Sequence, residues 1–369
     1  MVYLPRGRRG PSKRDLVRER TVQLARDNVW KENEEITHTV SELCSEVRSA
    51  VRPQLGKASA KGHEGRGASG DTTFSIDEVA EEKVGGILDR RDDIAYYTED
   101  RGLVADGNAR WLLIIDPIDG TRPAAAGLES CCVSVAVAPF RPDTGSLTMG
   151  DVFLGAVLEI KNEASFTAVR GGGVRIDIDG SLLEPCLSQK SSLNDIFWTA
   201  GYRGRPAEPL TTVIAELIDL SSVDGGYFDL GSATYSITRV VTGQMDLYVD
   251  AGQRMAEQNE LVRDMFLEIG HGAILNNYPY DLAAAALIAS EAGAAVSDAY
   301  GRPLDSYPLI PCGGGGQLSS VVSANSALHE AVLDRLDMGM IRLAARYRRG
   351  GAGDGDPCAG EAGEPAGRG

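Results

Sequence analysis

Two carboxylates stand three residues apart at the end of an apolar run. The run, Trp111–Ile115, is short and β-branched at its end, which is typical of a buried strand, and Asp116 and Asp119 follow it. Pro117 between them can neither extend the hydrogen-bond ladder of a sheet nor vary its φ. The spacing therefore predicts two carboxylates held together at the end of a strand, and carboxylate oxygens are the ligands that Mg²⁺ prefers.

The residues after these carboxylates predict a turn into a helix. Gly120 permits an unusual backbone angle, Thr121 is a good helix cap, and Pro123 is favoured early in a helix. The free N–H groups at such a helix start would form a phosphate-binding site beside the metal-binding site. A motif this short, taken alone, is more often a strand, an Asx turn and an ordinary capped helix.

Acidic residues in other parts of the chain change that balance. Glu99 directly follows a predicted strand at 93–98, as Asp116 follows its own strand. Asp281 precedes a helix of small residues that ends at Gly293, and the segment Asp71–Asp77 leads into another predicted helix. Asp281 and the 71–77 segment, taken singly, have an ordinary explanation as helix caps.

Together these segments resemble the inositol monophosphatase and fructose-bisphosphatase-like family of magnesium-dependent, lithium-sensitive phosphatases. The family's central motif, Asp-Pro-Ile/Leu-Asp-Gly-Thr, stands intact at Asp116–Thr121. Its second motif is matched by Tyr280–Ala284 and Glu291–Gly293, with Tyr in place of Trp, and Glu99 and Asp71 match its strand-end glutamate and an upstream acidic residue. Further segments resemble the family at 231–233, 246–248, 298–304 and 320–325, so the resemblance runs in order from about residue 71 to about residue 336.

Helix and strand patterns alternate along the chain, and helices layered on sheets are an economical way to bury both. With the resemblance, this alternation predicts an α/β (α+β) sandwich of helices and mixed or antiparallel sheets, a sugar-phosphatase-like fold with two lobes. We expect a basic segment and helix at 1–52, a metal-binding lobe at 53–190, a second lobe at 191–345 that completes the site, and a disordered tail at 346–369. Residues 56–70 have almost nothing to bury and are expected to form a mobile loop.

Converging carboxylates require counter-charges. Each close pair would be repelled by about 4 kcal/mol at an effective dielectric of about 20, so only cations make the cluster tolerable. Oxygen ligands without a nearby His or Cys favour Mg²⁺ or Mn²⁺ over zinc. The resemblance implies one Mg²⁺ on Glu99, Asp116 and the carbonyl of Ile118, a second on Asp116, Asp119 and Asp281, and a weaker third near Glu99.

The resemblance also implies the reaction, which is hydrolysis of a phosphate monoester by direct attack of metal-activated water, with no phospho-enzyme. Thr121, hydrogen-bonded to Asp71, would orient that water and help to remove its proton. The backbone N–H groups of Gly120 and Thr121 would hold the phosphoryl oxygens. The hydroxyl groups of a cyclitol or sugar would be bound by Asp119, Gly231, Ser232, Ala233 and Asp250.

Departures from the family pattern lie on the substrate side. Phe74 replaces the usual Thr of the upstream motif, Pro123-Ala124 replaces an Asn-Phe pair, and Phe228 replaces an arginine. The 29 residues between Asp250 and Tyr280 form a longer stretch than typical inositol monophosphatases carry. These changes bear on the identity of the substrate more than on the type of reaction.

Alternatives therefore stay open. One is a fructose-1,6-bisphosphatase-type activity, to which Arg122 and Arg203 would add a second anion site, although exposure to solvent is the default for arginine. Another is a catalytically weak, metal-binding regulatory homologue. A haloacid-dehalogenase-like enzyme is disfavoured, because its two aspartates are separated by one residue, whereas Pro117 and Ile118 separate them here.

Composition limits the partners. The 369 residues include 37 Lys+Arg against 53 Asp+Glu, a formal charge of −16, so a nucleic acid would be repelled. With 43% hydrophobic and 24% charged residues the chain is not disordered, and no apolar run reaches the roughly 18 residues of a membrane span. Six scattered cysteines predict a reduced, cytoplasmic protein. We expect a small-molecule phosphate ester as the partner, and the resemblance implies a homodimer.

Overall fold

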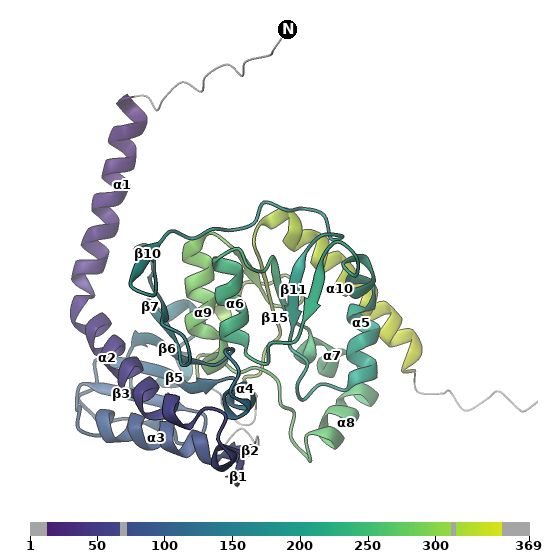
Figure 1. Cartoon of the computed structure of the whole chain (residues 1–369), viewed down its shortest axis with the longest axis horizontal. Coiled ribbons are helices and arrows are strands. Elements are labelled where there is room, and N and C mark those ends of the chain that lie inside the picture. Colours follow the sequence, from purple (N-terminus) through teal and green to yellow (C-terminus); the bar gives the residue numbers. More distant parts are fainter. Residues whose placement is uncertain (1–12, 67–71, 311–314, 349–369) are drawn as a thin grey trace, which may run out of the picture.

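Two large β-sheets alternate with layers of helices in the computed structural model, which describes residues 13–66, 72–310 and 315–348 (Figure 1). The larger sheet has eight strands in the order β10-β9-β8-β7-β6-β5-β3-β4, and the smaller has five in the order β12-β11-β13-β15-β14. The predicted sandwich of helices with mixed and antiparallel sheets is confirmed. Residues 1–12 and most of the predicted disordered tail lie outside the described residues.

The larger sheet is antiparallel except where β3 and β5 run parallel. Its strands are β3 (Ile94–Thr98), β4 (Gly102–Val104), β5 (Trp111–Asp119), β6 (Cys132–Pro139), β7 (Leu154–Glu159), β8 (Ala164–Val169), β9 (Gly173–Ile178) and β10 (Ser181–Leu183). Thr98 at the end of β3 pairs with Ile115 in β5, so Glu99 and Asp116 leave the same edge of the sheet. This register brings two of the predicted ligands together.

The smaller sheet is made from the second half of the chain. Its strands are β11 (Phe197–Ala200), β12 (Gly226–Phe228), β13 (Leu247–Asp250), β14 (Ala295–Ser297) and β15 (Ser320–Ser323). Strands β12, β11 and β13 are parallel neighbours, and β15 is antiparallel to both β13 and β14. The sheet is therefore mixed.

Helices cover both sheets. Helices α2 (Glu34–Val51) and α3 (Ser75–Leu88) pack on one face of the larger sheet. Helices α6 (Ala233–Val241) and α9 (Pro279–Ala292) pack on its other face and, through α6 and the end of α9, against the smaller sheet. The outer layer holds α5 (Ala207–Leu220), α10 (Ser326–Arg346), α7 (Gly252–Gln258) and α8 (Glu260–Ile269), as Figure 1 shows.

Strand β5 is buried because both of its faces meet helices. Leu112 and Ile114 belong to the apolar core beneath α6 and α9, whereas Leu113 and Ile115 belong to the core beneath α2 and α3. Side chains of a strand alternate between faces, so a continuous apolar run is what a strand covered on both sides needs. A third apolar core fills the space between the smaller sheet and the outer helices.

The N-terminal helical pattern and the predicted loop have different outcomes. The expected long or broken helix is a broken one, because α1 (Lys13–Glu32) and α2 are separated at Asn33, and α1 projects from the body in Figure 1. The prediction that residues 56–70 form only a loop is wrong for its described part. Ala58–Lys61 is a 3₁₀ turn, and β1 (His63–Arg66) pairs with β2 (Thr72–Phe74), since backbone hydrogen bonds need no apolar side chains.

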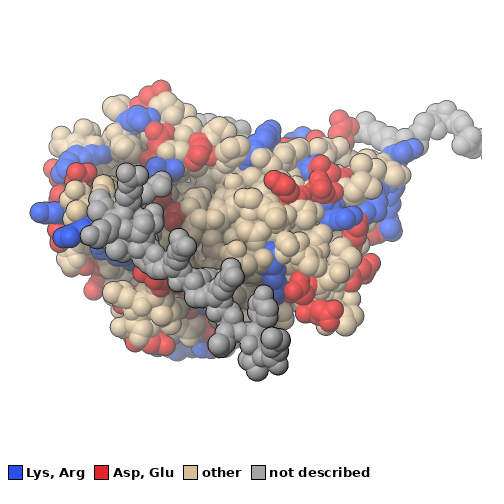
Figure 2. Space-filling view, turned by 90° about the horizontal axis from the view of Figure 1, so that it is seen from above, with Lys and Arg blue, Asp and Glu red and all other residues tan. Residues whose placement is uncertain are grey.

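No helix among the described residues is long and apolar enough to span a bilayer. Basic and acidic side chains are interspersed over the described residues on the face in Figure 2.

Candidate active site

The chain turns sharply at the end of β5. The register between β5 and β6 shifts between Asp116 and Asp119, and Gly120 follows with φ of 95°. A Cβ at Gly120 would lie 2.3 Å from the carbonyl oxygen of Ser130, so only glycine fits. Helix α4 (Thr121–Ala126) starts next, with Gly120 at the cap position. Thr121 was expected to be the helix cap, but it is the first residue of the helix.

Three carboxylates meet at this turn. Asp116 and Asp119 come from β5 and Asp281 from the first turn of α9, and a ligand oxygen of each lies within 4.8 Å of the others. Asp281 was expected to precede its helix, but the helix begins at Pro279, and the Asp281 carboxylate accepts from the N–H of Tyr278 at 2.6 Å. The helix start therefore fixes the position of this carboxylate.

Hydrogen-bond donors hold the other two carboxylates. The N–H of Ile118 donates to Asp116 Oδ1 at 2.9 Å. The hydroxyl of Ser232 and the N–H of Thr234 both donate to Asp119 Oδ2, at 2.7 and 2.6 Å. Because Ser232 and Thr234 stand at the start of α6, this helix orients an aspartate at the end of β5.

Burial and like charges oppose ionisation of the cluster. Burial, with the charges of Asp119, Asp281 and Glu99, raises the pKa of Asp116 well above its usual value. Burial and the charges of Asp119 and Glu99 do the same to the pKa of Asp281. Burial also raises the pKa of Asp119, against the hydrogen bonds from Ser232 and Thr234. Carboxylates held together in this way are stabilised by cations, and no His or Cys belongs to this described cluster, so the donor set fits Mg²⁺.

A hydroxyl and a fourth carboxylate lie beside the cluster. Thr121 Oγ1 donates to Asp77 Oδ1 at 2.9 Å and lies 3.2 Å from the carbonyl oxygen of Ile118. Asp77 also accepts from the N–H of Phe74 at 2.9 Å, and burial raises the pKa of Asp77 to about 7. Asp71, the expected partner of Thr121, lies outside the described residues, and the partner that the structure describes is Asp77.

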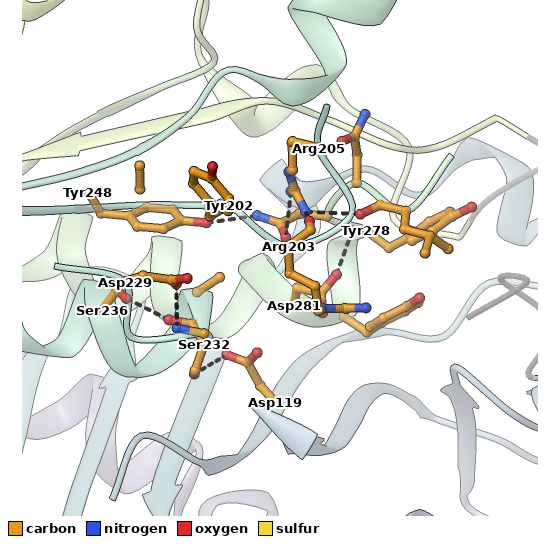
Figure 3. Close-up of a pocket in the computed structure, with 18 of the residues that line it drawn as sticks. Asp119, Tyr202, Arg203, Arg205, Asp229, Ser232, Ser236, Tyr248, Tyr278 and Asp281 are labelled. Atoms are coloured by element: carbon orange, nitrogen blue, oxygen red, sulfur yellow. Dashed lines mark hydrogen bonds between the residues drawn. The ribbon is translucent and has the colours of Figure 1, made fainter. Parts of the chain in front are cut away.

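Two hollows flank Glu99. The larger, a cleft of about 660 Å³ including its open mouth, has Glu99, Asp119 and Asp281 among its lining residues, and Figure 3 shows the last two. Other residues of its lining are Tyr202, Arg203, Arg205, Asp229, Tyr248, the segment 275–278 and Tyr280. The smaller hollow, of about 390 Å³, lies between Asp77, Glu99, Asp116 and Thr121. The cluster therefore has access to solvent on both sides of Glu99.

The residues expected to bind a leaving group separate into two sets. Gly231, Ser232 and Ala233 line the cleft. Asp250 is fully buried and is not one of the described residues that line the cleft; its carboxylate accepts from Arg205 and, at 2.8 Å, from the N–H of Gly252. Of the two arginines considered for a second anion site, Arg203 lines the cleft. Arg122 lies instead over the ring of Phe74, 5.3 Å from its centroid.

Three features were missed by sequence reasoning. Asp77 was treated as a capping residue, although its position within the first turn of α3 was a usable signal. The pairing of Arg205 with Asp250 joins residues 45 apart and leaves no periodic signal. The segment 275–278 falls in the long stretch after Asp250, for which no role was predicted.

Comparison with known proteins identifies the chain's relatives. A model of the inositol monophosphatase family matches residues 32–337. The chain belongs to the inositol monophosphatase family. It is 25% identical over 302 residues to a fructose-1,6-bisphosphatase/inositol-1-monophosphatase of Methanothermobacter thermautotrophicus, which covers 80% of this chain and 94% of the relative. It is 26% identical over 272 residues to an inositol-1-monophosphatase of Mesorhizobium japonicum, covering 72% and 82%.

A solved structure with the same fold is the IMPase of Thermotoga maritima, with a TM-score of 0.60 and 21% identity, covering 84% of this chain and 99% of that one. Members of the family are metal-dependent phosphatases. The family match joins the acidic cluster to a reaction class, and the chain is accordingly a phosphatase.

Proposed function

We propose that this phosphatase hydrolyses a small polyol or sugar phosphate, of the inositol monophosphate type, with Mg²⁺ as its metal. The meeting of Asp116, Asp119 and Asp281 within 4.8 Å carries the proposal, because it provides oxygen ligands at the side of an open cleft. Mn²⁺, which accepts the same ligands, would substitute.

The ions would be shared among a small set of oxygens. Glu99, Asp116 and the carbonyl of Ile118 would hold one Mg²⁺, and Asp116, Asp119 and Asp281 a second, with a weaker third near Glu99. When bound, the ions neutralise the charge of the ester and supply an activated water for direct attack. This assignment is supported by the place of Glu99, whose charge is close enough to raise the pKa of both Asp116 and Asp281.

The chain's own residues would orient the water and move its proton. Thr121 Oγ1 donates its hydrogen to Asp77, so its lone pairs can accept a hydrogen bond from water. Asp77, on the other side of the hydroxyl, would receive the proton that the water gives up. The pKa of Asp77, raised to about 7 by burial, suits a proton acceptor near neutral pH. In this proposal Asp77 takes the catalytic role that the sequence suggested for Asp71. The N–H groups of Gly120 and Thr121 would hold the phosphoryl oxygens.

The leaving group would lie in the cleft against the start of α6. Gly231, Ser232 and Ala233 line it, and Asp119 is oriented by Ser232. A fructose-1,6-bisphosphatase-type activity is the second candidate, favoured by Arg203 in the cleft lining and by the bifunctional name of the Methanothermobacter relative. A weak regulatory homologue is disfavoured, since the carboxylates that would bind metal are present and converge.

The test is phosphate release from a panel of esters by the purified protein, with Mg²⁺ titrated against EDTA. We expect Mg²⁺-dependent release, a higher kcat/KM for polyol or sugar phosphates than for simple alkyl phosphates, and no aspartyl-phosphate on trapping. Release that persists in EDTA would reject the metal mechanism. The homodimer and the cytoplasmic location stay predictions, for which sedimentation and cell fractionation are the measurements.

A further inference from the structure

On the side of the cleft that would face the leaving group, the structure differs from what the sequence predicted. Asp250, expected to bind a hydroxyl of the substrate, has no exposed surface and is enclosed by Arg205 and the N–H of Gly252. Figure 3 shows Arg205 and Tyr278 across the cleft from Asp119. A different set of side chains must therefore contact the leaving group there.

That set is supplied by the long stretch after Asp250. Helices α7 and α8 bury Met255, Val262 and Phe266 in the outer apolar core, which anchors the stretch. The chain then returns along the cleft, where residues 275–278 join the lining. We use the name leaving-group wall for Arg205, Tyr248 and residues 275–278.

The leaving-group wall is held in place through its backbone. Arg205 Nη1 donates to the carbonyl of Leu275 at 2.9 Å, and the N–H of Leu318 donates to the carbonyl of Asn277 at 3.0 Å. Arg205 Nη2 also donates to Asn277 Oδ1 at 3.5 Å, which leaves the amide N–H groups of Asn277 for other partners. Asp250 thus acts as a positioning residue, through Arg205, for the segment that replaces it at the cleft.

One side-chain pair on this wall has hydrogen-bonding capacity toward the cleft. Asn277 Nδ2 donates to the Tyr248 hydroxyl at 2.8 Å, marked in Figure 3 by the dashed line at the Tyr248 hydroxyl. Since that hydroxyl is the acceptor, its own hydrogen is left to donate, and the Asn277 amide keeps a second N–H. Both residues line the cleft, Tyr248 from β13 and Asn277 from the return segment.

We propose that the Asn277–Tyr248 pair binds a hydroxyl of the leaving group and determines the preference for a polyol ester. This inference rests on the proposed function and adds its specificity-determining residues. The Tyr248 hydroxyl is buried and Asn277 half-buried, so a leaving group without hydroxyls would leave donors of this pair unsatisfied. Such sites discriminate against analogues that lack the group. The pair is uncharged, so it favours a neutral polyol at this wall over a second anionic group.

The test compares Asn277→Ala, Asn277→Asp, Tyr248→Phe and the Ala/Phe double variant with wild type. The probes are myo-inositol 1-phosphate, glycerol 2-phosphate and phenyl phosphate, whose leaving group has no hydroxyl beyond the one released. In Asn277→Ala we expect kcat/KM for the preferred polyol ester to fall about tenfold more than kcat/KM for phenyl phosphate. Asn194→Ala, which removes the same amide from an exposed site outside the cleft, should keep the wild-type ratio.

The double variant sharpens the test. If both side chains bind one hydroxyl, the double variant loses no more of the ratio than the larger single loss, because either change breaks the same contact. Asn277→Asp keeps the size of the side chain, and it takes the place of Asn277→Ala in the comparison if the alanine variant does not fold. A polyol-to-phenyl ratio within about twofold of wild type in the folded variants overturns the inference. Absence of phosphate release from all esters by wild type would instead reject the proposed function.

Discussion

The two sides of the cleft accommodate buried charge in opposite ways. On the metal side, Asp116, Asp119 and Asp281 bring like charges together, and burial with mutual repulsion raises the pKa of Asp116 and Asp281. Behind the leaving-group wall, Asp250 is fully buried and is already paired with Arg205. Cations are needed to complete the first side but not the second. Under the proposed function, the metal side would govern whether the ester is cleaved, and the leaving-group wall which ester is cleaved.

The largest effect should follow from removing a charge on the metal side. Asp116→Asn removes the carboxylate that both proposed ions share, and we expect kcat to fall about 10⁴-fold, equivalent to ~5.4 kcal/mol of transition-state stabilisation. In EDTA at neutral pH the same variant should melt at a higher temperature than wild type, since a buried carboxyl whose pKa is raised costs stability there and an amide does not. Phosphate release and thermal melting are the measurements.

A matched control is available on the surface. Asp264→Asn makes the same chemical change at an exposed position of α8 and should alter neither measurement. An Asp116→Asn protein that retains a tenth of the wild-type kcat would show that the cluster is not the centre of the reaction.

The second effect concerns the stability of the leaving-group wall. Arg205→Ala leaves Asp250 buried without its partner, and we expect the free energy of unfolding to fall by about 4 kcal/mol. Arg346→Ala breaks an ion pair with Glu208 in which both side chains are more than half exposed (57% and 58%), and should cost less than about 1 kcal/mol. Guanidinium denaturation measures both. Equal losses in the two variants would mean that the Arg205–Asp250 pair is no better sequestered than a surface pair.

The sequence predicted the metal side of the cleft better than the leaving-group wall, and the reason is physical. Asp116, Asp119 and Gly120 are contiguous, and the strand, the proline and the glycine that position them can be recognised within a few residues. Asp281 and Glu99 could be joined to them only through the family resemblance, because convergence of distant segments depends on the register of β3 with β5 and on the packing of α9.

The leaving-group wall had no comparable local signal. The burial of Asp250 depends on Arg205, which arrives from the end of another strand, and no spacing in the chain indicates that meeting. Similarly, Asp71 and Asp77 lie in one short motif, and the choice between them depends on how α3 packs against β5. The pairing of β1 with β2 uses backbone groups, which a sequence rich in glycine does not reveal. Local motifs were therefore predictable, whereas contacts made by tertiary packing were not.

The third effect is a pH dependence of stability that should be larger without metal than with it. Burial raises the pKa of Asp77 from its usual 3.8, and that of Glu81 from its usual 4.5, to about 7 in each case. A carboxyl whose pKa is raised by folding contributes stability that is complete below its unfolded pKa and is lost as pH rises through the folded pKa. In EDTA each of these two carboxyls should thus cost the protein about 3 kcal/mol of stability between about pH 5 and about pH 8.

Mg²⁺ should reduce that loss, because a bound cation favours the charged carboxylates and lowers their pKa. Melting temperatures at several pH values, with saturating Mg²⁺ and with EDTA, make the comparison. A pH dependence of equal size in both conditions would mean that the metal side is not completed by a cation. Arg205→Ala should shift both curves downward without changing the difference between them, since Arg205 belongs to the other wall.

The smallest effect tests a single hydroxyl at the edge of the metal side. Thr121→Val keeps the shape of the side chain but removes the donor to Asp77, and we expect kcat to fall about 10²-fold, or ~2.7 kcal/mol. Thr121→Ser restores the hydroxyl and should recover most of the rate, which a merely structural role for the methyl group would not allow. The ratio of polyol to phenyl esters should stay at its wild-type value in both variants, because water activation is common to all esters. A change in that ratio would mean that the two sides of the cleft are coupled through Thr121, and the separation of cleavage from specificity would then fail.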